Sequence, residues 1–241
     1  MNDDSNPLGP PLGPPVPGWT PPPRPPREKM AGAWCRLEPL DPDRHALSLD
    51  AANRLDAAGA IWTYLSYGPF ATFDDYRAWA RNAAAGEDPL FFAVIDNRSG
   101  TATGVGSFLR IDLPNGVIEI GHLNFAPPLQ RTPAATEAVS LMMARAFALG
   151  YRRVEWKCNA LNVASRRAAL RLGFSFEGVF RQAMVVKGRN RDSAWYAVID
   201  RDWPEVLDAH RRWLDPLNFD SEGRQLTALS ALTAPLLKAR G

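Results

Sequence analysis

The chain lacks the features that mark several large classes of protein. It has only two cysteines, Cys35 and Cys158, which have no metal-ligand spacing and imply no disulfide framework, as in a reducing compartment. It has no run of about 18 apolar residues, so we expect no transmembrane helix and no membrane partner. The net charge is only +2 and the arginines are spread out, which argues against a nucleic-acid partner.

Proline, by contrast, is abundant at the N-terminus. Residues 1–32 are dominated by proline and glycine, a composition that cannot bury a core and favours extended conformations. We expect a disordered or extended arm, solvated or draped over the surface; a ligand for a proline-binding domain is the alternative. The start, Met1 to Asp4, is acidic and has no apolar core, unlike a signal peptide, so we expect a cytoplasmic protein.

The remaining chain is long enough for one sizeable domain, and its 46% hydrophobic and 22% charged residues are typical of a soluble globular protein. Hydrophobic periodicity predicts strands at 35–40, 90–95, 104–113, 117–125 and 154–158, and a hairpin of 176–186 with 193–199. It predicts helices at 43–58, 73–85, 133–149, 162–172, 203–213 and 222–238. Because an antiparallel meander precedes the first long helix, we predict an α/β (α+β) fold with a mixed, mostly antiparallel sheet.

Two strand–helix units stand out between Val117 and Phe174. The strand V-I-E-I-G-H-L-N-F leads to a compact turn, Q-R-T-P-A-A-T-E (130–137), which opens a long helix. The strand V-E-W-K-C leads through Asn159 to the helical segment N-V-A-S-R-R-A-A-L-R-L-G-F. A strand that feeds a small-residue turn at a helix N-terminus can hold a pyrophosphate on backbone N–H groups. The ordered pair is much more specific than the turn alone.

These segments resemble the GNAT superfamily of acyl-CoA-dependent N-acetyltransferases, and more narrowly its branch of ribosomal-protein N-terminal acetyltransferases (RimJ/RimL-like). The resemblance covers roughly residues 33–213, with 214–241 as a C-terminal helical extension. It implies the GNAT fold, in which splayed strands form an acyl-CoA cleft. The superfamily motif Arg/Gln-x-x-Gly-x-Gly/Ala aligns with residues 130–135. Pro133 stands where the family usually has glycine, so we expect CoA binding with one backbone N–H contact fewer.

The resemblance also implies which residues contact acetyl-CoA. A β-bulge in the first strand would free a backbone N–H near Leu123 to Phe125 for the oxyanion. Asn162 sits where the family places a cofactor-binding Asn, although an N-cap role is equally natural for it. The complete implied set is Leu123, Asn124, Phe125, Gln130, Arg131, Thr132, Ala134, Ala135, Thr136, Asn162 and Ser165.

The catalytic acid implied by the branch is Ser165, since Ala169 occupies the position at which many GNAT enzymes have a tyrosine. The helix N-terminus would stabilise a thiolate beside Ser165; the alternative is a first-turn serine that bonds backbone. Met184 likewise replaces the Glu of a related pattern. Cys158 has no basic sequence neighbour to activate it, so we predict no nucleophilic role.

Glu119 and His122 are the candidate general bases, and a water molecule is a third. Strand alternation places the two side chains on opposite faces, and a bulge between them would bring both to one side. A structural polar role is the alternative for each.

We therefore expect an acetyltransferase that uses direct attack in a ternary complex. The acceptor would be a primary amine, either a protein N-terminus or a small molecule. A longer acyl-CoA donor, or an acyl-CoA sensor without turnover, are the alternatives. We expect most of the aromatic cluster to be core, with one or two side chains at the substrate mouth: Trp62, Tyr64, Tyr67, Phe70 and Tyr76. The C-terminal leucines would either cover the sheet or form a homodimer contact: Leu226, Leu229, Leu232 and Leu236.

Overall fold

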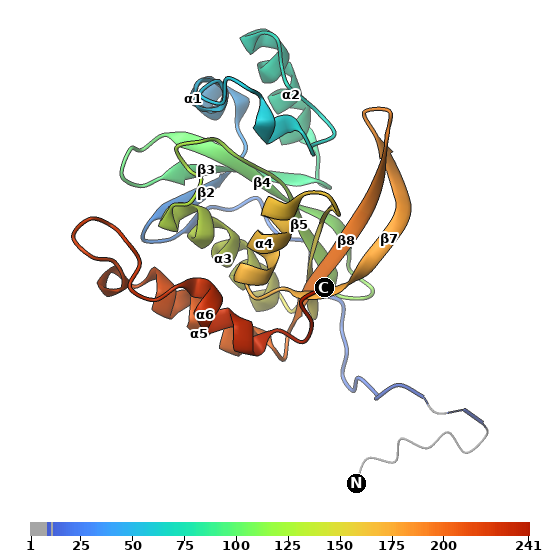
Figure 1. Ribbon diagram of the computed structural model, residues 1–241. Helices are drawn as coiled ribbons and strands as arrows, with labels where there is room; N and C mark the ends of the chain where they lie inside the picture. Colours follow the sequence, from blue (N-terminus) through green and yellow to red (C-terminus); the bar gives the residue numbers. More distant parts are fainter. Residues whose placement is uncertain (1–8, 11) are drawn as a thin grey trace.

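The computed structural model describes residues 9, 10 and 12–241 (Figure 1). The expectation about Met1 to Asp4 lies outside them. The described residues form an eight-stranded sheet in the order β1-β2-β3-β4-β5-β6-β8-β7. Neighbouring strands are antiparallel except β5 and β6, which are parallel. This confirms the predicted mixed, mostly antiparallel sheet. The strands are β1 Met30–Ala31, β2 Cys35–Pro39, β3 Leu90–Asp96, β4 Ala102–Asp112, β5 Val117–Phe125, β6 Arg153–Asn159, β7 Ser175–Val186 and β8 Arg189–Ile199.

Helices cover both faces of the sheet. In Figure 1, α1 and α2 lie on one side, and α3, α5 and α6 lie on the other. Within the described chain, no helix combines the length and the apolar character needed to cross a membrane. The helices are α1 Pro42–Asn53, α2 Phe73–Ala85, α3 Pro133–Ala148, α4 Val163–Arg171, α5 Trp203–Leu214 and α6 Leu229–Thr233, with 3-10 turns η1 Ala60–Trp62, η2 Pro216–Asn218 and η3 Ala234–Leu236.

Strand alternation divides the core into two clusters. Phe92, Phe108 and Ile118 belong to the larger cluster, under α3 and α5. Phe91 belongs to the smaller one, under α1 and α2, with Tyr76. Because successive side chains of a strand point to opposite faces, Phe91 and Phe92 serve different cores.

The parallel pair β5 and β6 diverges along its length. The strands pair at Val117↔Arg153, Ile118↔Val154 and Glu119↔Glu155, and the rest of β5 pairs with β4 alone within the described chain. In β4, Val105 opposes Asn124 but Ser107 opposes Gly121, so β5 contains one residue more than its partner. The extra residue is a β-bulge at His122, which adopts φ +50°. The expected bulge is therefore present, beside the gap between the strands.

Local signals fix the starts of the helices. The Thr72 hydroxyl and the Asp75 carboxylate form a reciprocal capping box, so α2 begins where the sequence predicts. Thr132 caps α3 with Pro133 in its first turn, and Asn162 caps α4. These three boundaries needed only residues within one turn.

Three predicted boundaries are wrong. The helix predicted at 43–58 ends at Asn53, because the Asp56 carboxylate accepts the N–H of Ile61 (2.8 Å) and Gly59 reverses the chain at φ +64°. Strand β8 begins at Arg189, not residue 193. The hairpin turn is only Lys187-Gly188, whose positive φ values (49° and 71°) suit a two-residue hairpin loop.

The helix predicted at 222–238 is also wrong. It shrinks to α6 and η3 because Asp220 accepts the N–H groups of Glu222 and Arg224 (both 2.9 Å), which closes a loop at Gly223, φ +76°. Of the four leucines in this region, Leu229 is fully buried in the main core and Leu226 is exposed. Leu232 and Leu236 pack against that core. This segment therefore covers the protein's own core.

The described part of the N-terminal arm lies against the domain. The Trp19 indole donates to the Pro114 carbonyl (3.1 Å), and the Arg152 guanidinium stacks on its ring. Tyr151 donates its hydroxyl to the Pro23 carbonyl (3.1 Å). Met30, within the predicted arm, pairs with Leu37 in the sheet. The draped alternative therefore describes these residues.

His210 is buried in the larger core, on α5. One ring nitrogen, Nε2, lies 3.0 Å from the Leu172 carbonyl, which can only accept, so Nε2 carries the proton. Nδ1 therefore accepts from the Ser140 hydroxyl at 3.0 Å. Burial lowers the pKa of His210 to about 4. The ring is thus neutral in the folded protein at neutral pH.

We predict that His210 makes the protein acid-sensitive. Between about pH 6.5 and pH 4 the unfolded chain protonates this histidine and the folded chain does not, so the free energy of unfolding falls as the pH falls. From pH 7 to pH 5 this single group should remove about 2 kcal/mol. His210→Ala should cost about 2–4 kcal/mol at pH 7 and show a smaller decrease toward pH 5. Urea unfolding of both proteins at pH 7 and pH 5 measures these free energies. If the variant lost as much stability between the two pH values as the wild type does, the prediction would be contradicted.

Candidate active site

A cleft of about 1070 Å³ opens where β5 and β6 diverge. Side chains from both faces of the sheet line it. One half, here called the helix half, is lined by the N-terminal ends of α3 and α4 and by Phe219 and residues 223–225. The other, the charged half, is lined on the α1/α2 side of the sheet by Arg110, Glu119, His122, Lys157 and Arg191.

The turn before α3 is held rigid by its own side chains. The Thr132 hydroxyl accepts the N–H of Ala135 (3.2 Å) and donates to the Leu129 carbonyl (2.6 Å). Gln130 donates its amide to the Phe125 carbonyl (2.7 Å), and Arg131 adopts φ +61°. The N-terminus of a 16-residue helix thus opens into the cleft. Such an end favours an anion through its free N–H groups and the helix dipole.

Asn124 provides a further polar group in the cleft, on the α1/α2 side of the sheet, because it pairs with Val105, which belongs to the smaller core cluster. Its side-chain oxygen is buried and, among the described residues, has no hydrogen-bond partner. A buried acceptor without a partner costs free energy, which a ligand N–H would recover. All the predicted cofactor contacts line the cleft except Ala134, whose side chain lies in the core.

Ser165 lies in the first turn of α4. The Asn162 side chain accepts the Ser165 N–H (3.1 Å), so the N-cap interpretation of Asn162 is correct, although Asn162 also lines the cleft. The Ser165 hydroxyl accepts from the Trp156 indole (3.0 Å), so its own proton can be donated to another group, and the Cys158 thiol is one such neighbour. Ala169 is buried in the core. Burial raises the pKa of the Cys158 thiol, opposed by Ser165, so this thiol stays protonated at neutral pH.

The far wall of the helix half comes from residues that our sequence analysis missed. Arg171, on α4, donates to the Thr136 hydroxyl (2.9 Å) and stacks on Trp213 at 4.6 Å. Trp213 in turn donates its indole N–H to Gln225 (2.8 Å). The six-residue spacing from Ser165 to Arg171 places the two side chains about 120° apart around the helix, so helical periodicity alone did not indicate Arg171. The contribution of Phe219 and residues 223–225 had no local signal.

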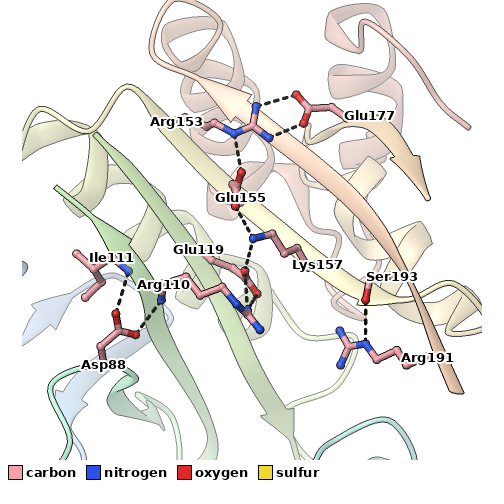
Figure 2. A network of polar contacts seen from close by, with 10 residues as sticks. All are labelled: Asp88, Arg110, Ile111, Glu119, Arg153, Glu155, Lys157, Glu177, Arg191 and Ser193. Atoms are coloured by element: carbon pink, nitrogen blue, oxygen red, sulfur yellow. Dashed lines mark hydrogen bonds and ion pairs between the residues drawn. The ribbon is translucent and has the colours of Figure 1, made fainter. Parts of the chain in front are cut away.

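A network of ion pairs crosses the charged half (Figure 2). Both oxygens of Glu119 accept from Arg110 (2.8 Å each), and Lys157 lies 3.0 Å from the same carboxylate. Only 3% of the Glu119 side chain is exposed. Burial raises the pKa of Glu119, while Lys157 and Arg110 act in the opposite direction. The Glu119 carboxylate therefore already forms ion pairs with two cations.

The network continues along β6. Lys157 also pairs with Glu155 (2.7 Å), which accepts from Arg153 (2.8 Å), and Arg153 pairs with Glu177. The Lys157 ammonium lies 3.7 Å from the centre of the Trp195 ring. The carboxylates of Glu119, Glu155 and Glu177 in this network are thus all paired with cations.

His122 lies on the same face as Glu119 because of the bulge. Its ring stacks on Tyr67 (centroids 5.6 Å apart) and contacts Phe91 (5.2 Å), which belongs to the α1/α2 side. Burial, with the nearby Arg110 and Arg191, lowers the pKa of His122 to about 4. The imidazole is therefore neutral at neutral pH.

The aromatic cluster divides between core and cleft. Trp62 and Tyr76 are buried and Tyr64 lines the cleft, as expected for one or two members. Tyr64 donates its hydroxyl to the Leu161 carbonyl (3.2 Å), and Lys187 donates to the Trp62 carbonyl (2.9 Å). These bonds join the segment around η1 to the approach to α4 and to the β7–β8 hairpin, across the charged half.

Comparison with known proteins identifies similar chains. The acetyltransferase (GNAT) domain family matches residues 35–175. The crystal structure of a GCN5-related N-acetyltransferase from Brucella melitensis is 48% identical, covers 91% of this chain and 100% of its own, and has a TM-score of 0.89. A probable GNAT-family acetyltransferase from Chromobacterium violaceum is 41% identical, covers 81% of this chain and 100% of its own, and has a TM-score of 0.74. No protein of curated function matches.

More distant structures share the fold alone. An acetyl transferase from Salmonella typhimurium that modifies the N-terminal serine of 50S ribosomal subunit protein L7/L12 is 21% identical, with a TM-score of 0.62. It covers 71% of this chain and 99% of its own.

Proposed function

Because this chain belongs to the GNAT acetyltransferase family and is an acyltransferase, we propose that it transfers an acetyl group from acetyl-CoA to a primary amine by direct attack in a ternary complex. The observation that carries this proposal is the continuous cleft between β5 and β6. It joins helix N-termini that suit a phosphate-bearing donor to a charged half that suits an acceptor. Both substrates can therefore meet beside the bulge.

The helix half fits acetyl-CoA, the co-substrate of this family. The turn 130–136 would hold the pyrophosphate on backbone N–H groups, with Pro133 offering none. The unpartnered oxygen of Asn124, on the α1/α2 side of the cleft, would accept an amide N–H where the pantetheine arm passes between the strands. Arg171, held by Thr136 and Trp213, adds a cation to the phosphate end. The extension 214–241 would thus complete the donor site of a transferase domain at 33–213.

The chain supplies donors on both sides of the reacting carbon. Acetyl-CoA, when bound, provides the acetyl group as an activated thioester. The backbone N–H of Leu123, at the bulge, would donate to the carbonyl oxygen as negative charge develops there. The Ser165 hydroxyl would donate to the leaving sulfur, which the N-terminus of α4 also stabilises.

His122 is the better candidate to accept the amine proton. Glu119 is occupied by Arg110 and Lys157, and it would hold those cations in place. His122 is neutral and lies on the same side of the sheet, beside the bulge. A base with a pKa of about 4 cannot deprotonate a free ammonium efficiently, so the amine would enter neutral and lose its proton during the attack.

This assignment predicts the pH dependence of the reaction. Because His122 is protonated only below about pH 4, kcat/KM for the acceptor should rise with pH along the titration of the acceptor amine, with no inflection near pH 6.5. His122→Gln should lower kcat about 10- to 100-fold without shifting the pH range over which kcat/KM rises. Initial rates from pH 5 to pH 9 measure both. An inflection near pH 6.5 that disappears in the variant would contradict the prediction.

For the acceptor we propose an amine in the cytoplasm, either a protein N-terminus, as in the RimJ/RimL-like branch, or a small molecule. A thiol-release assay with acetyl-CoA against primary amines and N-terminal peptides, alongside calorimetric titration with CoA, tests the function. We expect CoA binding and turnover of at least one class. CoA binding without turnover would favour the sensor alternative. Turnover only with a longer acyl-CoA would mean that the donor is that acyl-CoA and not acetyl-CoA. Absence of CoA binding would refute the proposal. Analytical ultracentrifugation of the same sample measures its mass and so tests whether the protein forms a homodimer.

A further inference from the structure

Arg191 is a cation of the charged half that has no carboxylate partner. It lies on β8 and lines the cleft. Its Nε donates to the Ser193 hydroxyl (3.3 Å), and among the described residues its side chain makes no other hydrogen bond and no ion pair. In Figure 2 its guanidinium points toward Arg110 and Glu119, with a single dashed line. The two terminal nitrogens of Arg191 are thus free to bind a ligand.

The neighbouring charges do not satisfy Arg191. Arg110 and Lys157 already share the Glu119 carboxylate, and the next carboxylate along β6 pairs with Lys157 and Arg153. Burial lowers the pKa of Arg191, Cys158 and Glu119 act against this shift without forming an ion pair with it, and Arg110 lowers the pKa further; the guanidinium stays protonated. A partly buried, permanent positive charge next to another cation is costly unless an anion approaches it.

The position of Arg191 is suited to the acceptor. Arg110 and Arg191 both act on the pKa of His122, so Arg191 lies within electrostatic reach of the base that we propose. The planar fork of an arginine matches the two oxygens of a carboxylate. A polyamine would instead bring further positive charge to this end of the cleft.

We propose that Arg191 binds a carboxylate of the acceptor, which is therefore an amine that carries a carboxylate group. A free amino acid and a peptide with an acidic N-terminal residue share this chemistry. This inference rests on the proposed acetyltransferase function. Arg191 is thus a residue that determines acceptor specificity.

Matched acceptor pairs test this with the full-length protein. The thiol-release assay compares glutamate with glutamine α-amide, and a peptide beginning with Glu with the same peptide beginning with Gln. The wild type should prefer the carboxylate member of at least one pair by about tenfold or more in kcat/KM. Arg191→Gln should raise KM for that member about 10- to 100-fold and remove the preference, with KM for acetyl-CoA within about twofold of the wild type.

Two further variants separate binding of the carboxylate from damage to the strand. Arg191→Lys keeps the charge and should retain part of the preference. Arg189→Gln removes an exposed arginine from the same strand, away from the cleft, and should leave both KM values unchanged. The preferred pair tells whether the acceptor is a free amino acid or a peptide.

The outcomes distinguish this inference from the proposed function. Turnover that favours the carboxylate-free members, or a preference that survives Arg191→Gln, would overturn the inference and leave the acetyltransferase proposal intact. If no acceptor turns over, calorimetry of the carboxylate-bearing acceptors with CoA present decides. Binding weakened about tenfold by Arg191→Gln supports the inference, and equal or absent binding overturns it.

Discussion

Replacing Ser165 by alanine is expected to lower kcat for acetyl transfer by about 100-fold, because no other hydroxyl lies in the first turn of α4 to protonate the leaving sulfur. The Ser165 hydroxyl accepts from the Trp156 indole, so its own proton is the one it can donate. KM for acetyl-CoA should change little, since the turn before α3 is untouched. Steady-state kinetics with calorimetry of CoA binding separates the two effects.

Two companion variants control this experiment. Ser165→Thr keeps a hydroxyl and should recover much of the lost rate. Cys158→Ala removes the nearby thiol; direct attack needs no cysteine nucleophile, so turnover should stay within a few-fold of the wild type. A Ser165→Ala protein with unchanged kcat would refute the role of Ser165 as the acid. Loss of turnover in Cys158→Ala with CoA binding intact would refute direct attack.

Replacing Glu137 by alanine is expected to lower the free energy of unfolding by about 3–5 kcal/mol. The Glu137 carboxylate, on α3, accepts three consecutive backbone N–H groups, those of Ala33 (2.8 Å), Trp34 (2.7 Å) and Cys35 (2.7 Å). It fastens the start of β2 to α3. Without it, three donors in a largely buried place have no partner.

Urea unfolding, followed by tryptophan fluorescence, measures this effect. Glu137→Gln keeps one acceptor oxygen and should cost less than Glu137→Ala. Gly32→Ala should also destabilise, because its new methyl group would collide with the Glu137 carboxylate. Glu28→Ala is the matched control: Glu28 is exposed and makes one ion pair with Arg145 (3.3 Å), so a change below about 0.5 kcal/mol is expected. A similarly small effect for Glu137→Ala would contradict the prediction.

Features encoded within one or two turns of chain could be predicted from the sequence. Thr72 with Asp75, Thr132 with Pro133, and Asn162 each fixed a helix start by hydrogen bonds to residues at most three positions away. Hydrophobic alternation located β5 correctly. The ordered motifs in turn predicted the fold class and the acetyltransferase family, whereas the roles of individual site residues stay predictions.

The predicted helix at 222–238 shows that a local hydrophobic pattern does not always determine the backbone conformation. Leucines at helical spacing indicated one long helix, but the Asp220 loop and the packing of Leu229 into the core outweigh that preference. Leu229, Leu232 and Leu236 do face the core, as the pattern indicated, but contacts with α4 and α5 determine the backbone conformation of this segment.

By itself, the sequence determined the fold class, the family and the starts of α2, α3 and α4, because the capping signals of those helices are short-range. Tertiary structure decided the rest. The bulge that brings His122 and Glu119 to one face depends on the register of β5 against β4. The unpaired state of Arg191 depends on which carboxylates the pairing of β8 with β6 brings near it. Register and charge pairing join residues far apart in the chain, so only the folded protein reveals them.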